Sequence, residues 1–308
     1  AITIFLAEPP RTTASGLIVV ADVNINDLLA FAIDGDTLHR QWIAHPGGPV
    51  VTYATAGDVT LASTAQRQLV AYDDNGVRLW QTAVPELVVA PPTATEDGRF
   101  VTVGLDGTVT LFDALTGEPA WSHGLGTDVE RSAVVTGDTV TVIDRAGTMT
   151  ALSLADGEVL WSHAGAPAMG LIALDTTLVV AGADGWVRAI SAETGQLGHS
   201  WRYPGAWRAL LNLGDVVVVA SSEITLGLDP KTGRELWWGS GVESMVGDGV
   251  VAVALLDSTA TAINARGERL AEWDVPESFA WSAQYVVATR DGILFMHSGS
   301  DATILGAR

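Results

Sequence analysis

The sequence predicts an all-β protein built from one repeated unit of about 40 residues, and two observations carry this prediction. First, an apolar run, a tight turn and a closing tryptophan recur together, as in "LFDALTGEPAW" (111–121) and "ALSLADGEVLW" (151–161). Second, seven tryptophans that close such units follow one another at spacings of 38, 41, 40, 40, 36 and 36 residues. These are Trp42, Trp80, Trp121, Trp161, Trp201, Trp237 and Trp273. A constant period of this length indicates a repeat architecture.

Each unit contains the signals of four strands. In "EDGRFVTVGLDGTVTLFDALTGEPAW" (96–121) a turn is followed by two apolar runs and then by the hairpin. Valine and threonine alternate there with period two, as they do in strands. Asp-Gly and Thr-Gly pairs supply the positive φ angles that tight hairpins require. Because no helical periodicity of useful length is present, repeated four-stranded units predict a β-propeller.

The closing tryptophans have a structural explanation. On an outermost strand, a tryptophan ring can lie across the gap to the next unit and bury roughly 150–250 Å² of surface. We therefore expect these seven residues to hold neighbouring blades together and not to bind a cofactor.

The number of blades depends on how the chain closes. "PPTATEDGRFVTV" (91–103) aligns with "PPRTTASGLIVVA" (9–21), so "ITIFL" (2–6) falls where an outer strand or the following link belongs. Residues 278–297 supply three more strands without an eighth closing tryptophan. We expect a single propeller domain over residues 1–308 with eight four-stranded blades, the last one built from both termini, with residues 2–6 beside 292–297. Seven blades are the alternative, and "ATILGA" (302–307) is the competing source of the outer strand.

Composition excludes several classes of function. The formal net charge is −20, from 36 acidic and 16 basic residues, which disfavours binding to nucleic acid and to anionic lipid. The chain has no cysteine, so disulfides and thiolate chemistry are impossible. No apolar run approaches the roughly 18 residues of a membrane span, and "AITIFLA" (1–7) lacks the basic flank of a signal peptide. We expect membrane association only through a segment outside this chain.

The blade ends resemble the PQQ-like, or quinoprotein-type, propeller repeat, whose last hairpin reads Ala-x-Asp-x-x-Thr-Gly-Lys-Glu-x-Trp. This motif matches residues 227–237 at Asp229, Thr232, Gly233, Glu235 and Trp237, and residues 111–121 at Asp113, Thr116, Gly117 and Trp121. The resemblance extends over essentially the whole chain. It implies a propeller located outside the cytoplasm, periplasmic or on the cell surface.

The resemblance also implies where a ligand would bind. In this family the links between blades and the turns between second and third strands form the ligand face. The candidate residues on this face are His45, Arg67, Glu130, Arg131, Arg145, Tyr203, Trp207, Arg208, Glu243, Trp281 and Arg290. We expect Trp207 and Trp281, which precede innermost strands, to line the mouth of a central channel.

Catalytic and metal sites have weaker support. "DVNIND" (22–27) has alternating oxygen ligands, but an EF-hand loop needs glycine at its sixth position and glutamate at its twelfth, where Asp27 and Ile33 stand. His123 and His163 share the "WSH" pattern without a third ligand. We therefore expect no cofactor, no metal and no enzymatic activity. The favoured function is a non-catalytic scaffold that binds a protein partner. A ligand-sensing ectodomain of a membrane receptor and a small PQQ-dependent oxidoreductase are the alternatives.

Overall fold

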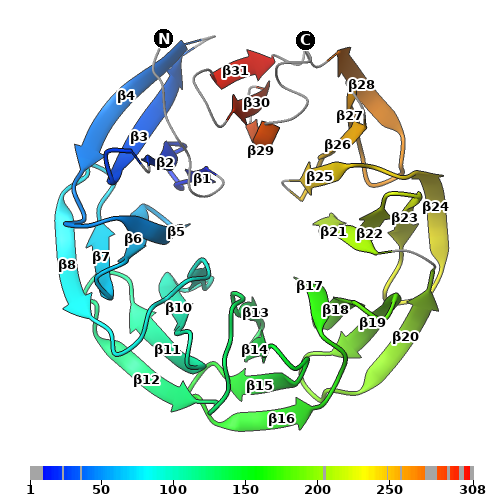
Figure 1. Ribbon diagram of the computed structural model, residues 1–308, viewed down its shortest axis with the longest axis horizontal. Helices are drawn as coiled ribbons and strands as arrows, with labels where there is room; N and C mark the ends of the chain where they lie inside the picture. Colours follow the sequence, from blue (N-terminus) through cyan, green and yellow to red (C-terminus); the bar gives the residue numbers. More distant parts are fainter. Residues whose placement is uncertain are drawn as a thin grey trace. The chain divides into compact units, whose positions relative to one another are not determined.

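The described residues form β-strands and no helix. The computed structural model describes residues 10–22, 24–34, 37–203, 206–247, 249–256, 259–274, 283–289, 292–297 and 302–305. Their strands make seven sheets of four strands and one sheet of three, and neighbouring strands pair antiparallel (Figure 1). No helix in this part of the chain is therefore available to cross a membrane.

Contacts group the described residues into two compact units, of which unit 1 is drawn from Ala1–Arg145 and Leu152–Val159. Three four-stranded sheets lie wholly within it, each with its strands in chain order. Their strands are β1 (Arg11–Thr12), β2 (Ile18–Asp22), β3 (Asp27–Asp34) and β4 (Thr37–Ala44); β5 (Val50–Ala56), β6 (Val59–Thr64), β7 (Gln68–Tyr72) and β8 (Arg78–Ala83); and β9 (Thr93–Ala94), β10 (Arg99–Val103), β11 (Thr108–Asp113) and β12 (Pro119–Gly124).

Unit 2 is drawn from Ala146–Ala151, Leu160–His297 and Ala302–Arg308. Its sheets comprise β17 (Ala168–Leu174), β18 (Thr177–Gly182), β19 (Trp186–Ser191) and β20 (Leu197–Arg202); β21 (Trp207–Leu213), β22 (Val216–Ser221), β23 (Ile224–Leu228) and β24 (Glu235–Ser240); β25 (Ser244–Gly247), β26 (Ala252–Leu256), β27 (Thr259–Ile263) and β28 (Arg269–Asp274); and β29 (Ala283–Thr289), β30 (Gly292–His297) and β31 (Ala302–Leu305). One further sheet has residues in both units and comprises β13 (Val134–Thr136), β14 (Thr139–Ile143), β15 (Met149–Ser153) and β16 (Val159–His163).

The prediction of eight four-stranded blades is wrong, because the described strands build seven four-stranded sheets and one sheet of three. In that last sheet, β30 pairs with β29 on one side and with β31 on the other. The strand beside residues 292–297 therefore comes from the C-terminal segment, with Leu305 opposite Ile293, and not from residues 2–6. Whether residues 2–6 add a fourth strand to this sheet is a prediction that falls outside the described residues.

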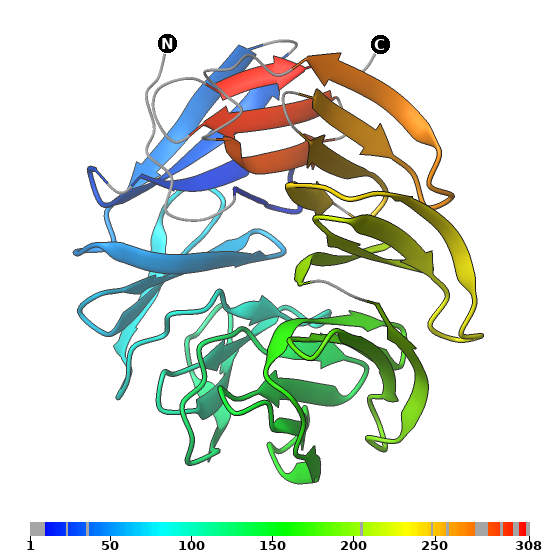
Figure 2. The ribbon, with the colours of Figure 1, turned by 45° about the vertical axis from the view of Figure 1, so that its right-hand side comes forward.

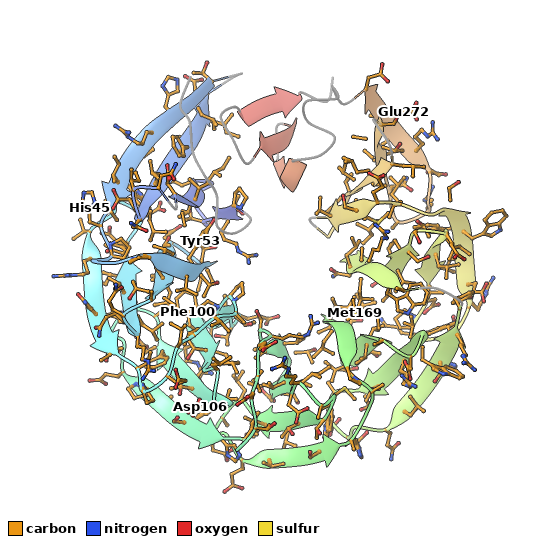
Figure 3. All side chains as sticks on the ribbon, in the orientation of Figure 1. His45, Tyr53, Phe100, Asp106, Met169 and Glu272 are labelled. Atoms are coloured by element: carbon orange, nitrogen blue, oxygen red, sulfur yellow. The ribbon has the colours of Figure 1, made fainter. Side chains whose placement is uncertain are left out.

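The hydrophobic core of each unit lies between neighbouring sheets. First strands of successive sheets contact one another, as β5 contacts β9 in unit 1 and β21 contacts β25 in unit 2. In each four-stranded sheet the fourth strand lies at the opposite edge (Figures 1 and 2). Tyr53 on β5 and Phe100 on β10 are fully buried in unit 1 (Figure 3). The Tyr53 hydroxyl donates to the Val19 carbonyl of the adjacent sheet at 3.2 Å, so the core also fixes how two sheets face each other.

In six of the described sheets, a tryptophan on the fourth strand joins the sheet to the next one. The Trp121 indole N–H donates to the carbonyl of Leu154, in the turn between the third and fourth strands of the following sheet, at 2.9 Å. The ring covers Gly157 in the same turn, which has a φ of +76° and where a Cβ would lie 2.6 Å from a ring carbon. The same indole bond runs from Trp42 to Asp74, Trp80 to Ala114, Trp161 to Ala192, Trp201 to Gly233 and Trp237 to Ala265. The side chain of Trp273 lies outside the described part of the structure.

A bulge accompanies this contact. Trp121 lies opposite Leu111, but Pro119 lies opposite Phe112, so β12 contains one extra residue just before its tryptophan. The extra residue also directly precedes the tryptophan on β4, β8 and β24, whereas on β20 and β28 it lies earlier in the strand. A bulge bends a strand and increases its local twist. This directs the tryptophan of an edge strand toward the neighbouring sheet.

Candidate functional site

The candidate site is built from the links that connect one sheet to the next and from the turns between second and third strands. These segments share one end of each sheet, which we call the loop end. In unit 1, backbone hydrogen bonds connect them from sheet to sheet. They run from Val84 N–H to the Arg67 carbonyl at 2.9 Å, from Leu105 to Leu87 at 2.9 Å and from Val129 to Leu105 at 3.1 Å. The loop end of unit 1 is therefore held by main-chain bonds that do not depend on any one side chain.

Arg67 occupies the turn between β6 and β7 in a left-handed conformation, with a φ of 57°. Its guanidinium donates to the Pro85 carbonyl at 3.1 Å and lies 3.4 Å from a carboxylate oxygen of Glu86. The same carboxylate oxygen accepts the Leu87 N–H at 2.8 Å. An exposed ion pair of this kind adds little to stability, so its main effect is to fix the direction in which Arg67 and Glu86 present their charges.

Glu130 and Arg145 form a second pair on the same end of unit 1. A carboxylate oxygen of Glu130 lies 3.5 Å from a guanidinium nitrogen of Arg145, and both side chains are largely exposed. The Arg145 N–H donates to the Asp128 carbonyl at 3.2 Å, which holds the turn after β14 against the link before β13. Arg131, the next residue along that link, is also exposed. Three of the predicted candidates thus lie close together.

His45 lies in the link between β4 and β5, where Figure 3 labels it. Its side chain is 74% exposed, and Nδ1 lies 2.7 Å from a carboxylate oxygen of Asp27. Asp27 is the first residue of β3 and is mostly buried. Asp27 was not among the predicted ligand-face residues, because a single aspartate at a strand start carries no distinctive signal.

A groove of about 230 Å³ opens beside Glu86, between the link after β8 and the sheet β9–β12. Phe112 and Val88 form a buried apolar base, and hydroxyl-bearing side chains line the walls. These are Thr82, Thr102, Thr108, Thr110 and Ser122. Asp106, labelled in Figure 3, lies on the rim and accepts hydrogen bonds from the N–H and the hydroxyl of Thr108, both at 2.9 Å. This groove was not predictable from sequence, because its residues come from two repeats and none of them carries a distinctive signal.

The aromatic candidates of unit 2 are less exposed than predicted. Trp207 is only 3% exposed and belongs to the core between β17–β20 and β21–β24, so it does not line an open channel mouth. Its indole N–H has no acceptor among the described residues. Tyr203 packs edge-on against Trp207 with ring centroids 6.1 Å apart. Burial raises the pKa of the Tyr203 phenol above its ordinary value, and the nearby Glu235 carboxylate raises it further.

The polar candidates of unit 2 meet in a main-chain contact. A guanidinium nitrogen of Arg208 donates to the Glu243 carbonyl at 3.1 Å, and the Glu243 N–H donates to the Leu255 carbonyl at 2.8 Å. Arg208 therefore connects the first strand of one sheet to the link that leads into the next. Trp281 and Arg290 lie outside the described residues.

Two further features of unit 2 were absent from the predicted set. Trp186 on β19 has the guanidinium carbons of Arg188 and Arg202 at 5.5 and 5.6 Å from its ring, both within cation–π range. Trp238 on β24 is 78% exposed. The only sequence signal for Trp238 was that it follows the closing tryptophan of its repeat. In the part of the chain that the structure describes, no group of three or more His, Asp or Glu could hold a metal ion.

Comparisons with known proteins agree on the fold. A family model described as outer membrane protein assembly factor BamB matches residues 26–170. The protein of that name from Burkholderia pseudomallei (strain K96243) is 25% identical over 225 residues, which cover 67% of this chain and 59% of that relative. The match thus spans less than two thirds of the relative.

Three solved structures are similar over almost the whole chain. The crystal structure of BamB from Moraxella catarrhalis has a TM-score of 0.74 at 16% identity, covering 99% of this chain and 98% of that one. The computationally designed Ika8 protein has a TM-score of 0.80 at 16% identity, covering 99% and 98%. The C-terminal WD40 domain of Sif2 has a TM-score of 0.80 at 11% identity, covering 100% and 97%. At these identities the likeness shows the fold, which is a β-propeller.

The family model over residues 26–170 and the Burkholderia relative support a PQQ-like β-propeller repeat, as the sequence analysis predicted. Each four-stranded sheet is one blade of this propeller. The repeat motif now has a structural explanation. Its glycine gives the turn a positive φ and leaves room for the indole of the preceding blade, whereas its tryptophan reaches the turn of the following blade.

Proposed function

We propose that this PQQ-like propeller is a non-catalytic, protein-binding scaffold that engages a protein partner through its loop end and takes part in outer membrane protein assembly. The relatives support the biological setting, because the matching family model and the Burkholderia relative both carry the name outer membrane protein assembly factor. The proposed location is outside the cytoplasm, with attachment to a membrane through a segment outside this chain.

One observation carries the proposal at the level of residues. The exposed side chains of Arg67, Glu130 and Arg145 are mounted on loops that main-chain hydrogen bonds fix from blade to blade. A pre-organised surface loses less conformational entropy on binding than a mobile one. Arginine is also among the residues that most often dominate the binding energy of protein interfaces. The loop end of unit 1 therefore has the rigidity and the residue types of a protein-binding surface.

Charge reversal tests this proposal. We expect Arg67→Glu and Arg145→Glu, separately, to weaken the complex with a partner identified by in-cell crosslinking, when affinity is measured with both proteins purified. An arginine at an interface hot spot accounts for about 2 kcal/mol or more, which corresponds to a roughly thirtyfold or greater loss of affinity. Arg234→Glu is the matched control, because Arg234 is exposed in the turn between β23 and β24, away from the loop end. Equal affinity of the wild-type protein and both loop-end variants would contradict the proposed surface.

A further inference from the structure

The fourth strand β24 presents an open backbone edge. Its sheet has the order β21-β22-β23-β24, so one edge of β24 pairs with β23 and the other edge ends the sheet (Figures 1 and 2). The register pairs Leu226 with Trp238 and Ile224 with Ser240. Backbone N–H and C=O groups on the outer edge have no strand partner in the described part of the chain. Such a row of donors and acceptors is a template for another strand.

Natural proteins protect such edges with charged residues or proline. Most fourth strands of this propeller carry such a residue within the strand or at its end. The examples are Arg40 on β4, Arg78 on β8, Pro119 on β12, Arg202 on β20, and Arg269, Glu272 and Asp274 on β28. On β24 the charged residue is the first one, Glu235, as Arg78 is on β8, and Leu-Trp-Trp-Gly-Ser follows without charge or proline. β16 is similar in composition but has serine where β24 has its second tryptophan.

Trp238 makes this edge different from the other fourth strands. It is 78% exposed, the highest value among the exposed large hydrophobic residues that the structure describes, and Leu236 on the same strand is 43% exposed. The position after the closing tryptophan is polar in five other repeats, where it is Gln81, Ser122, Ser162, Arg202 and Asp274. An exposed tryptophan on a rigid strand is the residue type most enriched at the centres of protein interfaces. Its register partner on β23, Leu226, is buried in the unit 2 core.

The chemistry of the surface specifies its occupant. A row of alternating backbone donors and acceptors is satisfied by an extended strand and not by a helix. A second copy of this chain is disfavoured, because each copy has a formal net charge of −20. The same net charge favours basic residues in an incoming strand. Near one end of β24 an acidic residue adds to this preference, because Glu223 is exposed next to Ile224, which lies opposite Ser240. At the other end, exposed Arg234 precedes Glu235, so the charges there are mixed.

We propose that β24 accepts an extended strand of a partner protein, in which basic residues flank an apolar side chain that packs on Trp238. This binding mode goes beyond the proposed loop-end function, because it uses the outer edge of β24 and none of the loop-end residues. Main-chain pairing supplies affinity with little sequence dependence, and Trp238 selects an apolar residue in the partner strand.

The test uses the full chain and a synthetic peptide, acetyl-Lys-Val-Thr-Val-Thr-Val-Lys-amide, in isothermal titration calorimetry. We expect saturable binding that Trp238→Ala weakens by about tenfold or more, as for an interface hot spot. Gln81→Ala, at the equivalent position of β8, should leave the affinity unchanged. A peptide methylated on alternate backbone nitrogens, on the edge that would face β24, should lose binding because it cannot donate to the strand edge.

Several outcomes would overturn the proposal. Equal binding by wild-type and Trp238→Ala protein would remove the assigned anchor, and equal binding of the methylated peptide would exclude strand pairing. No binding at millimolar peptide, or tighter binding of the peptide with glutamates in place of lysines, would also contradict it. A concentration-dependent dimer that Trp238→Ala abolishes in sedimentation velocity would identify a second copy as the occupant instead. Because these variants leave the loop end intact, failure here is distinguishable from failure of the loop-end proposal.

Discussion

Replacing Trp121 with alanine tests how one blade is held to the next. The wild-type indole donates to the Leu154 carbonyl at 2.9 Å and covers Gly157 of the following blade. The ring also packs against the buried cluster that contains Val140 and Leu152. Trp121→Ala removes the ring, the hydrogen bond and the support for the turn in a single change.

The expected loss can be divided into two parts. Large-to-small replacement of a buried tryptophan costs about 3–5 kcal/mol, and because Trp121 is partly exposed we expect about 3 kcal/mol. Loss of the hydrogen bond accounts for about 1 kcal/mol of this. Trp121→Phe keeps most of the apolar contact but has no N–H, so it should cost about 1–2 kcal/mol.

Urea unfolding monitored by circular dichroism measures these losses, provided that the slope of the transition is the same for all variants. Trp238→Ala is the matched control. Its ring is 78% exposed, so its removal should change stability by less than about 0.5 kcal/mol. Hydrogen exchange adds a local measurement, because the Gly157 N–H bonds to the Ser153 carbonyl at 2.8 Å in the supported turn. In Trp121→Ala this amide should exchange faster.

The reasoning would be refuted if Trp121→Ala cost no more than Trp238→Ala. It would also be refuted if the Gly157 amide kept its protection in the alanine variant. Either result would mean that the indole contact does not hold the two blades together.

Five further experiments have defined outcomes. Gly117→Ala should cost more than the roughly 1–2 kcal/mol of a left-handed alanine, because its Cβ would lie 2.5 Å from the Trp80 ring. Gly98→Ala has φ +80° but nothing within 4 Å, so urea unfolding should show only the backbone cost. Burial raises the pKa of Tyr72 from 10.0 to about 12, so the contribution of its neutral phenol to the free energy of unfolding should be fully present below pH 10 and decrease toward pH 12. Tyr72→Phe should lack this part of the alkaline decrease in stability. An unchanged decrease in the variant would contradict the assignment to Tyr72. Deleting residues 302–308 removes β31 and should lower the melting temperature and promote aggregation through the exposed edge of β30; an unchanged melting temperature would refute this. Given pyrroloquinoline quinone and calcium, the protein should not catalyse dye-linked alcohol or sugar oxidation, and turnover that a chelator abolishes would contradict the non-catalytic proposal.

The strands and their closing tryptophans were predictable because their signals are local. Alternation with period two and a glycine at a positive-φ turn position are both contained in about a dozen residues, as in 111–121. The hydrogen-bond acceptor of each indole N–H was not predictable, because it lies in the turn of another repeat, as Leu154 does for Trp121. The direction of the indole also depends on a bulge, such as the one between Pro119 and Trp121.

Errors arose where the backbone departs from regular alternation or where distant segments meet. Trp207 was expected at a channel mouth, but a register shift between Trp207 and Ala209 accompanies its placement in the core. Either residues 2–6 or residues 302–307 could have paired with the strand at 292–297. The alignment of residues 9–21 with 91–103 favoured residues 2–6, whereas β30 pairs with β31 from the C-terminal segment. Trp238 was overlooked because it occupies a position whose residue type varies from blade to blade.

The contact between successive blades is directional, and this has a consequence for how such a chain can change its length. The indole of one repeat contacts the next repeat along the chain, where it meets a backbone carbonyl and a glycine. Trp80, for example, donates to the Ala114 carbonyl and covers Gly117. A single copied segment of about 40 residues therefore carries both halves of the joint and matches itself. Duplication or loss of one whole repeat preserves every remaining joint, whereas insertion of half a repeat leaves an indole without its turn.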